Sequence, residues 1–396
     1  MVKRILIVSS TVLFLLGIYV GMGQVRAQQE GVDLTKVALI TNRDSHDLSL
    51  IDLETDQVIG RVSVGIGASP HMAMVTHGGD RIVASATGLN EMVIIDGKNL
   101  KELRRIPVGK GPEHFDLSGD DRWLYVGNLD DGTVSVIDLD RLQETQRISG
   151  FFEPHGATID SSKGKVYIPN FGAHEVGVLD IKSQRLSTRV GVGGSFRYAA
   201  LDPARYLAEV KGVANVTLTV DGRFGYLADG DSNSVAILDT QNDQIIKQIK
   251  VGVEPWRAYA SMDGRWMLVP NNGDKTVAVI RTSDHQLVTQ LRGGEGMTGI
   301  NFALGGKKAF CISSNESAVY VYDLDKMKVI DRIKLGQNLR LETASTTSDG
   351  KRIYLTCSTN NSVYVIDAQT HRILRIPEVG QAPWGVAIHD GQNYCH

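Results

Sequence analysis

The segment Val134-Ser135-Val136-Ile137-Asp138 decides the fold, because it is one of eight related copies along the chain. Each copy is a short, mostly apolar strand, and each ends in Asp except the sixth, which ends in Arg281. The copies end at residues 52, 96, 138, 180, 239, 281, 323 and 367. Neighbouring ends are 42 to 44 residues apart, except for one interval of 59 residues between 180 and 239. Such a regular period indicates one structural unit that is used repeatedly.

Each period has room for four strands. In one unit, an alternating strand at 244–251 is followed by a loop with Pro255 and a second strand at 255–261. The turn Asp263-Gly264 is a strong hairpin signal, and it leads into a strand at 266–270 and then into the next apolar copy. Four antiparallel strands in a period of about 40 to 45 residues are typical of a β-propeller blade. A blade has two apolar faces, so it needs a neighbour on each side, and a closed ring supplies both.

The strands at the two ends of the chain set the number of blades. Residues 36–64 supply three strands, and residues 383–388 supply one more. We predict an all-β fold with a single closed propeller over residues 28–396, in which these four strands complete the eighth blade. Seven blades is the alternative, if one unit near the long interval forms no blade. The repeated Asp is expected to be structural, because its carboxylate can start a turn by accepting from nearby backbone N–H groups.

The first 27 residues resemble an export signal. Lys3 and Arg4 are followed by an almost unbroken apolar run at 5–22, and Val25-Arg26-Ala27 offers a small-residue cleavage site. We predict a signal peptide at 1–27, with an uncleaved membrane anchor as the alternative. No later stretch approaches the ~18 consecutive apolar residues of a transmembrane helix, so no stable membrane span is expected after signal removal.

Composition excludes several classes of function. The 42 basic and 45 acidic residues are interspersed without a basic block, so no nucleic-acid partner is expected. The chain has no Cys-x-x-Cys-His, so no haem is covalently attached. Cys311 and Cys357 lie inside expected strands and are predicted to be buried thiols. The terminal Tyr394-Cys395-His396 is expected to be the tail of the closing strand.

The residues that follow Pro in the loops between blades are candidate site residues. These loops contain Pro70-His71, Pro112-Glu113-His114, Pro154-His155, Pro255-Trp256-Arg257 and Pro383-Trp384, with Met297 and Arg340 in degenerate copies. Each loop leads into an innermost strand, so its residues should surround the mouth of the central channel. His71, His114 and His155 are therefore candidate ligands of a metal ion or a haem iron, because imidazole is a common neutral ligand for both. The alternative is a polar funnel or a partner contact.

Two further segments are candidates for contacts with a partner. Trp256, Arg257 and Trp384 are residue types that anchor protein interfaces, although a Trp here could equally cap the core between blades. Glu254 could pair with Arg257, or it could bind a cation at a subunit boundary. The long interval holds an inserted loop at about 191–213, where Asp202-Pro203 predicts the start of a short helix. Its aromatic residues are further candidates for such contacts: Phe196, Tyr198 and Tyr206.

The blade consensus Val-Gly-x-x-Pro, Asp-Gly-Lys/Arg and Asn-x-x-Val-x-Val-Ile-Asp resembles the YVTN-type repeats and the related propeller of cytochrome cd1, which holds haem d1. The length, the export signal, the missing haem motif and the loop at 253–257 also resemble the β subunits of hydrazine synthases from anammox bacteria. That resemblance implies a non-catalytic subunit of an oxidoreductase complex in nitrogen metabolism, located in the periplasm or the anammoxosome lumen. Hydrazine would form from nitric oxide and ammonium on haems of partner subunits, with the loop at Glu254 near such a haem.

Two alternatives remain for the function. The first is a haem d1-binding propeller, either a nitrite-reductase-like enzyme or a carrier, with a histidine of the channel mouth on the iron. The second is a lactonase-like hydrolase, although the chain shows no cluster of acidic ligands at the mouth. A haem or a metal ion at the channel mouth is consistent with the first alternative, and a haem shared with a partner is consistent with the subunit.

Overall fold

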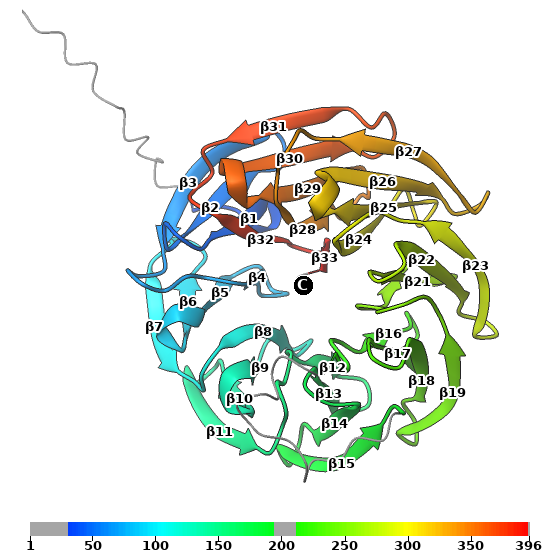
Figure 1. Cartoon of the computed structure of the whole chain (residues 1–396). Helices are drawn as coiled ribbons and strands as arrows, with labels where there is room; N and C mark the ends of the chain where they lie inside the picture. The colour runs from blue at the N-terminus through cyan, green and yellow to red at the C-terminus, as the bar shows by residue number, and fades with distance from the viewer. Residues whose placement is uncertain (1–30, 194–210, 395–396) are drawn as a thin grey trace, which may run out of the picture. The chain divides into compact units, whose positions relative to one another are not determined.

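The chain folds as a ring of eight β-sheets, and each sheet is one blade (Figure 1). This computed structural model describes residues 31–193 and 211–394. The all-β propeller with eight blades is confirmed, and the alternative of seven blades is wrong. The signal peptide predicted at 1–27, the helix predicted after Asp202, and the residues Phe196, Tyr198, Tyr206 and Cys395 lie outside the described residues.

Blades 2 to 7, numbered along the chain, are each built from four consecutive strands, with the first nearest the ring axis and the fourth at the rim (Figure 1). Blade 2 holds β4 (Ala73–Val75), β5 (Arg81–Ala86), β6 (Glu91–Asp96) and β7 (Glu102–Pro107). Blade 3 holds β8 (Pro112–Leu117), β9 (Trp123–Asn128), β10 (Thr133–Asp138) and β11 (Gln143–Ser149). Blade 4 holds β12 (Thr158–Asp160), β13 (Lys165–Asn170), β14 (Glu175–Asp180) and β15 (Arg185–Gly191).

The same order of strands continues through the next three blades. Blade 5 holds β16 (Thr217–Leu218), β17 (Phe224–Asp229), β18 (Ser234–Asp239) and β19 (Gln244–Lys250). Blade 6 holds β20 (Tyr259–Ala260), β21 (Trp266–Asn271), β22 (Thr276–Arg281) and β23 (Gln286–Arg292). Blade 7 holds β24 (Met297–Ala303), β25 (Lys308–Ser313), β26 (Ala318–Asp323) and β27 (Lys328–Lys334).

Blade 1 closes the ring with strands from both ends of the described chain. It holds β1 (Val37–Asn42), β2 (Asp47–Asp52), β3 (Gln57–Ser63) and the innermost strand β32 (Pro383–Ile388). β1 and β32 are antiparallel, and Leu39 pairs with Ala387 in this ladder. The predicted closure by the segments 36–64 and 383–388 is therefore confirmed.

Blade 8 has a fifth strand, which the sequence did not suggest. It holds β28 (Leu341–Thr346), β29 (Arg352–Cys357), β30 (Ser362–Asp367), β31 (Ile373–Pro377) and β33 (Gln392–Tyr394). After β32 the chain turns back at Gly391, whose N–H donates to the carbonyl oxygen of Ile388 at 3.0 Å. β33 then pairs with β28 on the inner edge of blade 8. We expected Tyr394 to belong to the tail of the closing strand. It does not, because this turn moves the chain to the neighbouring blade.

Helical structure in the described ranges is limited to short 3-10 turns. These are η1 (Leu34–Lys36), η2 (Thr87–Leu89), η3 (Leu129–Asp131), η5 (Ser314–Glu316) and η6 (Ser358–Asn360). Among the described residues, no helix has the length and the apolar character that crossing a membrane requires.

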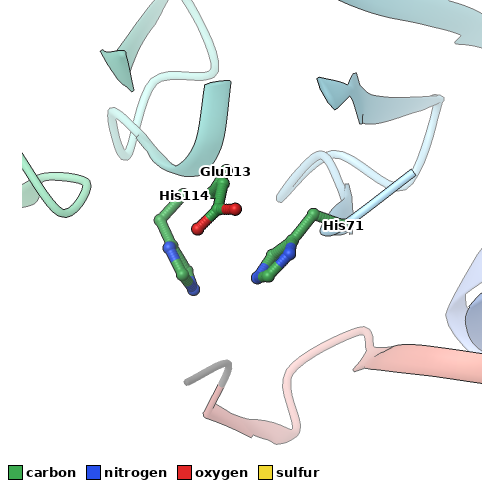
Figure 2. Close-up of side chains that lie close together, drawn as sticks. All are labelled: His71, Glu113 and His114. Carbon is green, nitrogen blue, oxygen red and sulfur yellow. The ribbon is translucent and has the colours of Figure 1, made fainter. Parts of the chain in front are cut away.

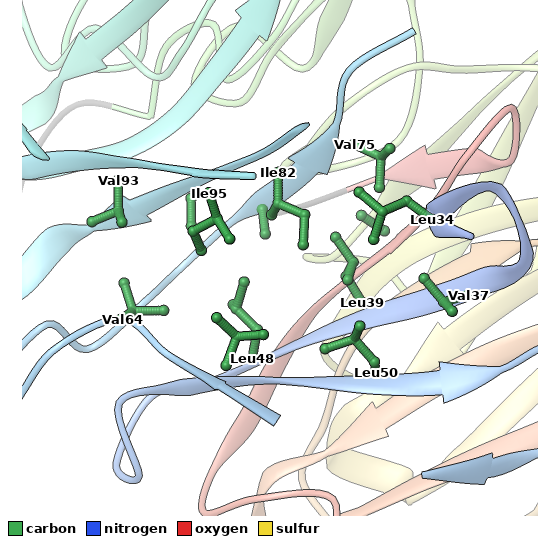
Figure 3. Close-up of a cluster of buried hydrophobic side chains, with 14 of the residues drawn as sticks. Leu34, Val37, Leu39, Leu48, Leu50, Val64, Val75, Ile82, Val93 and Ile95 are labelled. Carbon is green, nitrogen blue, oxygen red and sulfur yellow. The ribbon is translucent and has the colours of Figure 1, made fainter. Parts of the chain in front are cut away.

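The hydrophobic core lies between neighbouring blades. In β10 and β14 nearly every residue is buried, because each face of a blade packs on an adjacent blade. The outermost strands, such as β19, alternate between exposed and less exposed residues. Figure 3 shows one cluster between blades 1 and 2, in which Leu39 and Leu50 pack with Ile82 and Ile95. Burying one such side chain stabilises the fold by about 1.5 to 3 kcal/mol.

The repeated Asp starts a turn that joins each blade to the blade before it. Asp180 accepts from the backbone N–H of Ser183 at 2.7 Å and from its hydroxyl at 2.6 Å, and these bonds lower the pKa of Asp180. The residue four positions after each repeat end has a positive φ in all eight blades: Asp56, Leu100, Leu142, Gln184, Asp243, His285, Met327 and His371. Several of these side chains reach the preceding blade. His285 Nδ1 lies 2.6 Å from the hydroxyl of Tyr226, for example.

We predict that Asp180→Ala lowers the free energy of unfolding by about 1 kcal/mol, because the turn loses the hydrogen bonds donated by the backbone N–H and the hydroxyl of Ser183. Urea denaturation followed by circular dichroism measures the change. Arg281→Ala is the matched control, because Arg281 occupies the equivalent position and makes an exposed ion pair with Asp284. An exposed pair contributes little, so equal destabilisation by both substitutions would contradict the role of the Asp.

His174 and Asp229 form an ion pair between blades 4 and 5 that should make stability depend on pH. His174 Nδ1 lies 2.6 Å from a carboxylate oxygen of Asp229, and this hydrogen bond raises the pKa of His174. The stabilisation is therefore fully present below pH 6.5, the ordinary pKa of histidine, and is lost as pH rises through the raised pKa. We expect His174→Gln to destabilise the protein more at pH 6 than at pH 9.

Thermal unfolding at both pH values measures this difference. His285→Gln is the control, because burial lowers the pKa of His285. The contribution of His285 to the stability of the wild-type protein is therefore lost on acidification. The advantage of the wild type over that variant should shrink at low pH, which is the opposite trend. A penalty for His174→Gln that does not change with pH would show that the pair is not ionic.

Candidate functional site

The loops that enter the innermost strands have a common backbone design. The residue before each Pro, or before its equivalent, has a positive φ at six positions: Ser69, Gly111, Glu153, Glu254, Gly296 and Ala382. Several of these residues are held by an Asn side chain of the preceding blade. The backbone N–H of Gly111 donates to Asn90 Oδ1 at 3.0 Å, and that of Glu254 donates to Asn233 Oδ1 at 2.8 Å. The loops therefore have fixed positions relative to two blades.

The strand pairing shows which residues of the different loops occupy equivalent positions. Pro112, Pro154, Pro255 and Pro383 each pair with the Asn that ends the adjacent strand of the same blade. Counted from the Pro, His71 and His155 are one residue further on, whereas His114 is two residues further on. Glu113 therefore occupies the place that a histidine has in blades 2 and 4. In blades 7 and 8 the paired residues are Met297 and Leu341, so Thr298 and Glu342 take that place.

The structure brings the three candidate histidines together. The ring centroids of His71 and His114 are 4.7 Å apart, and those of His114 and His155 are 4.3 Å apart. Trp384 lies 5.4 Å from His71, and Trp256 lies 6.1 Å from His155. We call these five residues the mouth cluster. They come from blades 1, 2, 3, 4 and 6, as the position of the loops predicts, and their role as ligands stays a prediction.

His155 is held in one tautomer. Its Nδ1 lies 2.9 Å from the carbonyl oxygen of Ala214. A carbonyl oxygen can only accept, so Nδ1 carries the proton, and Nε2 of the neutral ring carries the lone pair. This is the arrangement in which proteins present an imidazole to a metal, because the second nitrogen orients the ring.

Arginines surround the mouth cluster. The guanidinium of Arg43 lies 4.6 Å from the ring centroid of Trp384, and that of Arg340 lies 5.7 Å from the same centroid. Arg340 Nε is also 3.0 Å from a carboxylate oxygen of Glu342. Arg257 lines a cavity of about 160 Å³ together with His114 and His155. Cationic groups thus lie around an aromatic patch.

Buried and half-buried carboxylates are the site residues that sequence reasoning missed. Burial raises the pKa of Glu113 and that of Glu342. The nearby charge of Arg43 offsets only part of this rise in each case. Burial, with a contribution from nearby Asp130, raises the pKa of Glu153 to about 7. Glu113 belongs to the Pro112-Glu113-His114 motif, whereas only the register of the repeat reveals Glu342.

Asp116 is a fourth acidic group and lines the same cavity as His114 and His155. Burial raises its pKa to about 6, although its carboxylate accepts backbone N–H bonds from Leu117 and Ile159 at 2.9 and 2.8 Å. The carboxyl group of Asp116 at the cavity therefore has a pKa of about 6.

The loop at 253–257 differs in detail from expectation. Glu254 pairs with Lys211 at 2.8 Å, and both side chains are about half exposed, whereas the sequence suggested Arg257 as its partner. A cation at Glu254 stays a prediction, and it would compete with this lysine. Trp256 is partly buried, and its ring centroid lies 5.4 Å from that of Phe171. Both tryptophans of the mouth cluster thus cap neighbouring rings and keep an exposed part.

The two described cysteines are buried free thiols, as predicted. Burial raises the pKa of Cys311 to about 12, so its thiol is not a nucleophile at neutral pH.

Comparisons with known proteins identify the family. The model of a family described as YNCE-like beta-propeller matches residues 83–393, so the chain belongs to this family. None of the curated proteins compared by sequence matches.

Solved structures with a similar fold include the following three. The dihydro-heme d1 dehydrogenase NirN in complex with DHE is 15% identical, with a TM-score of 0.75, over 91% of this chain and 76% of that one. The Kuenenia stuttgartiensis hydrazine synthase is 17% identical, with a TM-score of 0.57, over 78% of this chain and 97% of that one. A functionally unknown protein from Desulfotomaculum acetoxidans is 16% identical, with a TM-score of 0.56, over 75% and 95%. These likenesses show the fold.

We predict that Glu153→Gln stabilises the protein at pH 8. The pKa of this carboxyl is raised in the fold, so the folded state loses stability as pH rises from about 4.5 through 7. The amide removes a buried negative charge near Asp130 and should add about 1 to 2 kcal/mol at pH 8. Urea denaturation at pH 5 and pH 8 measures the gain, which should vanish at pH 5. A loss of stability at pH 8 would contradict the raised pKa.

Proposed function

We propose that this YNCE-like β-propeller binds an anionic tetrapyrrole of the haem d1 type at its mouth cluster. The observation that carries the proposal is the orientation of His155, whose Nδ1 donates to the carbonyl oxygen of Ala214 at 2.9 Å. This bond leaves the lone pair of the neutral ring on Nε2, the atom that would bind an iron.

The residues around His155 fit such a ligand. Trp256 and Trp384 offer apolar ring faces at opposite ends of the histidine row, next to His155 and His71 respectively. A tetrapyrrole with carboxylate groups also needs cations, and Arg43, Arg257 and Arg340 surround the same region. When bound, the haem would supply an iron centre for electron transfer or for chemistry on a small ligand. The residues of this chain would orient the macrocycle and neutralise its charge.

The similarity to NirN supports the proposal at the level of the fold. That protein is described as a dehydrogenase of dihydro-heme d1 in complex with DHE, and 91% of this chain superimposes on it. Either an enzyme or a carrier is consistent with the site. We further propose that residues 1–27 direct export to the periplasm or an equivalent lumen, because they combine a basic start, an apolar run and a small-residue site.

A non-catalytic subunit of a multihaem complex is the second candidate, and the sequence alone favoured it. Its support is the loop at 253–257, where Val253 is 46% exposed, together with the fold of hydrazine synthase, 97% of whose chain is matched. In this case haems of a partner would face the mouth cluster. The structure favours binding of the haem by this chain itself, because a docking surface alone does not require three packed imidazoles with arginines around them.

Titration with haem d1 tests the first proposal. We expect the wild-type protein to shift the absorption bands of the haem, and His155→Ala to bind at least tenfold more weakly, because the iron loses its imidazole. Arg257→Ala should weaken binding with a smaller change in the spectrum. His77→Ala is the control, because His77 lies in the turn between β4 and β5, at the other end of that innermost strand.

Purification from the native source separates the two candidates. Co-purification of multihaem cytochromes with a colourless chain would favour the subunit. A lone chain that causes no band shift would contradict both candidates.

A further inference from the structure

Three side chains of blades 2 and 3 converge on one point of the mouth cluster. His71 comes from the loop before β4, and Glu113 and His114 are neighbours in β8. One nitrogen of each imidazole and one oxygen of the carboxylate all lie within 4.8 Å of one another. Figure 2 shows the carboxylate between the two imidazoles, with His71 facing the other two residues across the space between the blades.

Two imidazoles and one carboxylate form a donor set for divalent transition metals. Zn²⁺ and Fe²⁺ bind such sets at about 2.0 to 2.2 Å, which places the ligand atoms about 3 to 3.5 Å apart. The observed separations are at most 4.8 Å, so small rotations of the side chains would close the site. Three protein ligands also leave positions for water or a small molecule.

This arrangement does not suit a haem iron. A macrocycle occupies four positions around the iron and leaves two axial positions on opposite sides. Side chains that converge from one side could therefore supply only one ligand to a haem. His71, Glu113 and His114 together fit a mononuclear ion that binds directly to the protein.

The backbones that carry the three ligands are already fixed. The carbonyl oxygen of His71 accepts from Thr41 Oγ1 of blade 1 at 3.0 Å. Glu113 and His114 lie in a bulge of β8, and on either side of it Pro112 pairs with Asn128 and Phe115 pairs with Val126. Gly156 of blade 4 leaves room for His114, because a Cβ at Gly156 would lie 2.8 Å from the Cβ of His114. Only side-chain torsions remain to be ordered when an ion binds, which favours tight binding.

The surroundings keep bulk water from the two imidazoles. His71 and His114 are only 4% and 8% exposed. A dication would favour the ionised form of Glu113. Arg43 is the opposing cation near this carboxylate.

We propose that His71, Glu113 and His114 bind one divalent first-row transition-metal ion, with the open coordination positions available to water or a small ligand. The site does not depend on the tetrapyrrole. It uses His71 and His114 together with Glu113, whereas the proposed haem uses His155.

Metal titration of the full chain, stripped with chelator and free of haem, tests this site. Co²⁺ is the probe, because its visible absorption reports the ligands, and elemental analysis after Zn²⁺ loading gives the stoichiometry. We expect one ion per chain, and at least tenfold weaker binding for His71→Ala, Glu113→Gln and His114→Ala. Glu144→Gln is the matched control and should bind as the wild type does, because Glu144 lies in the outermost strand β11, where it pairs with Arg147.

Further variants and a folding control complete the test. Thermal unfolding of each metal-free variant shows whether it is folded. Gly156→Ala keeps all three ligands but displaces His114, so it should also weaken Co²⁺ binding. His155→Ala should lose the haem band shift and keep the Co²⁺ spectrum, so the two proposals fail independently. Binding well below one ion per chain, or unchanged binding by folded Glu113→Gln and His114→Ala, would overturn the site.

Discussion

Every blade of this protein has two apolar faces, and that constraint governs the rest of the structure. A single sheet with two apolar faces is unstable in water, so each blade needs a neighbour on both sides. In a row of blades, the first and the last would each keep one bare face. The ladder between β1 and β32 removes both bare faces at once, because blade 1 takes three strands from one end of the described chain and its innermost strand from the other. The inter-blade clusters follow from this closure.

Closure also explains why functional side chains of several blades lie close together at one end of the ring. Loops from successive blades reach the same place near the axis, and side chains of the preceding blade hold several of them. The scaffold is rigid where the strands are, whereas the loop residues can change without loss of the core. His71, Glu113 and His155 stand at one equivalent position of three consecutive blades. Their side chains differ, because the repeat determines the backbone there and leaves the residue type to function.

The repeat allowed most of the fold to be predicted, but only part of the site. The spacing of Asp52, Asp96 and its later copies predicted the blades and their number, since a period of whole blades is a long-range signal that survives local irregularities. β33 was missed because its three residues show no pattern of their own. The roles of Glu113 and His114 depend on a bulge that shifts β8 by one residue against β9, and the sequence does not display such a shift. The pair of Glu254 with Lys211 joins residues 43 positions apart, so no local motif could reveal it.

The place of β32 in blade 1 has a consequence for how the chain is made. Until Ile388 has been synthesised, β1 has no partner along its inner edge, and the ring stays an open arc with the first and last blades uncovered. Translation alone therefore cannot complete the fold blade by blade, whatever local structure the early units acquire. The same open arc exposes a strand edge and an apolar face, so a chaperone that covers both would be most needed in the last seconds of synthesis.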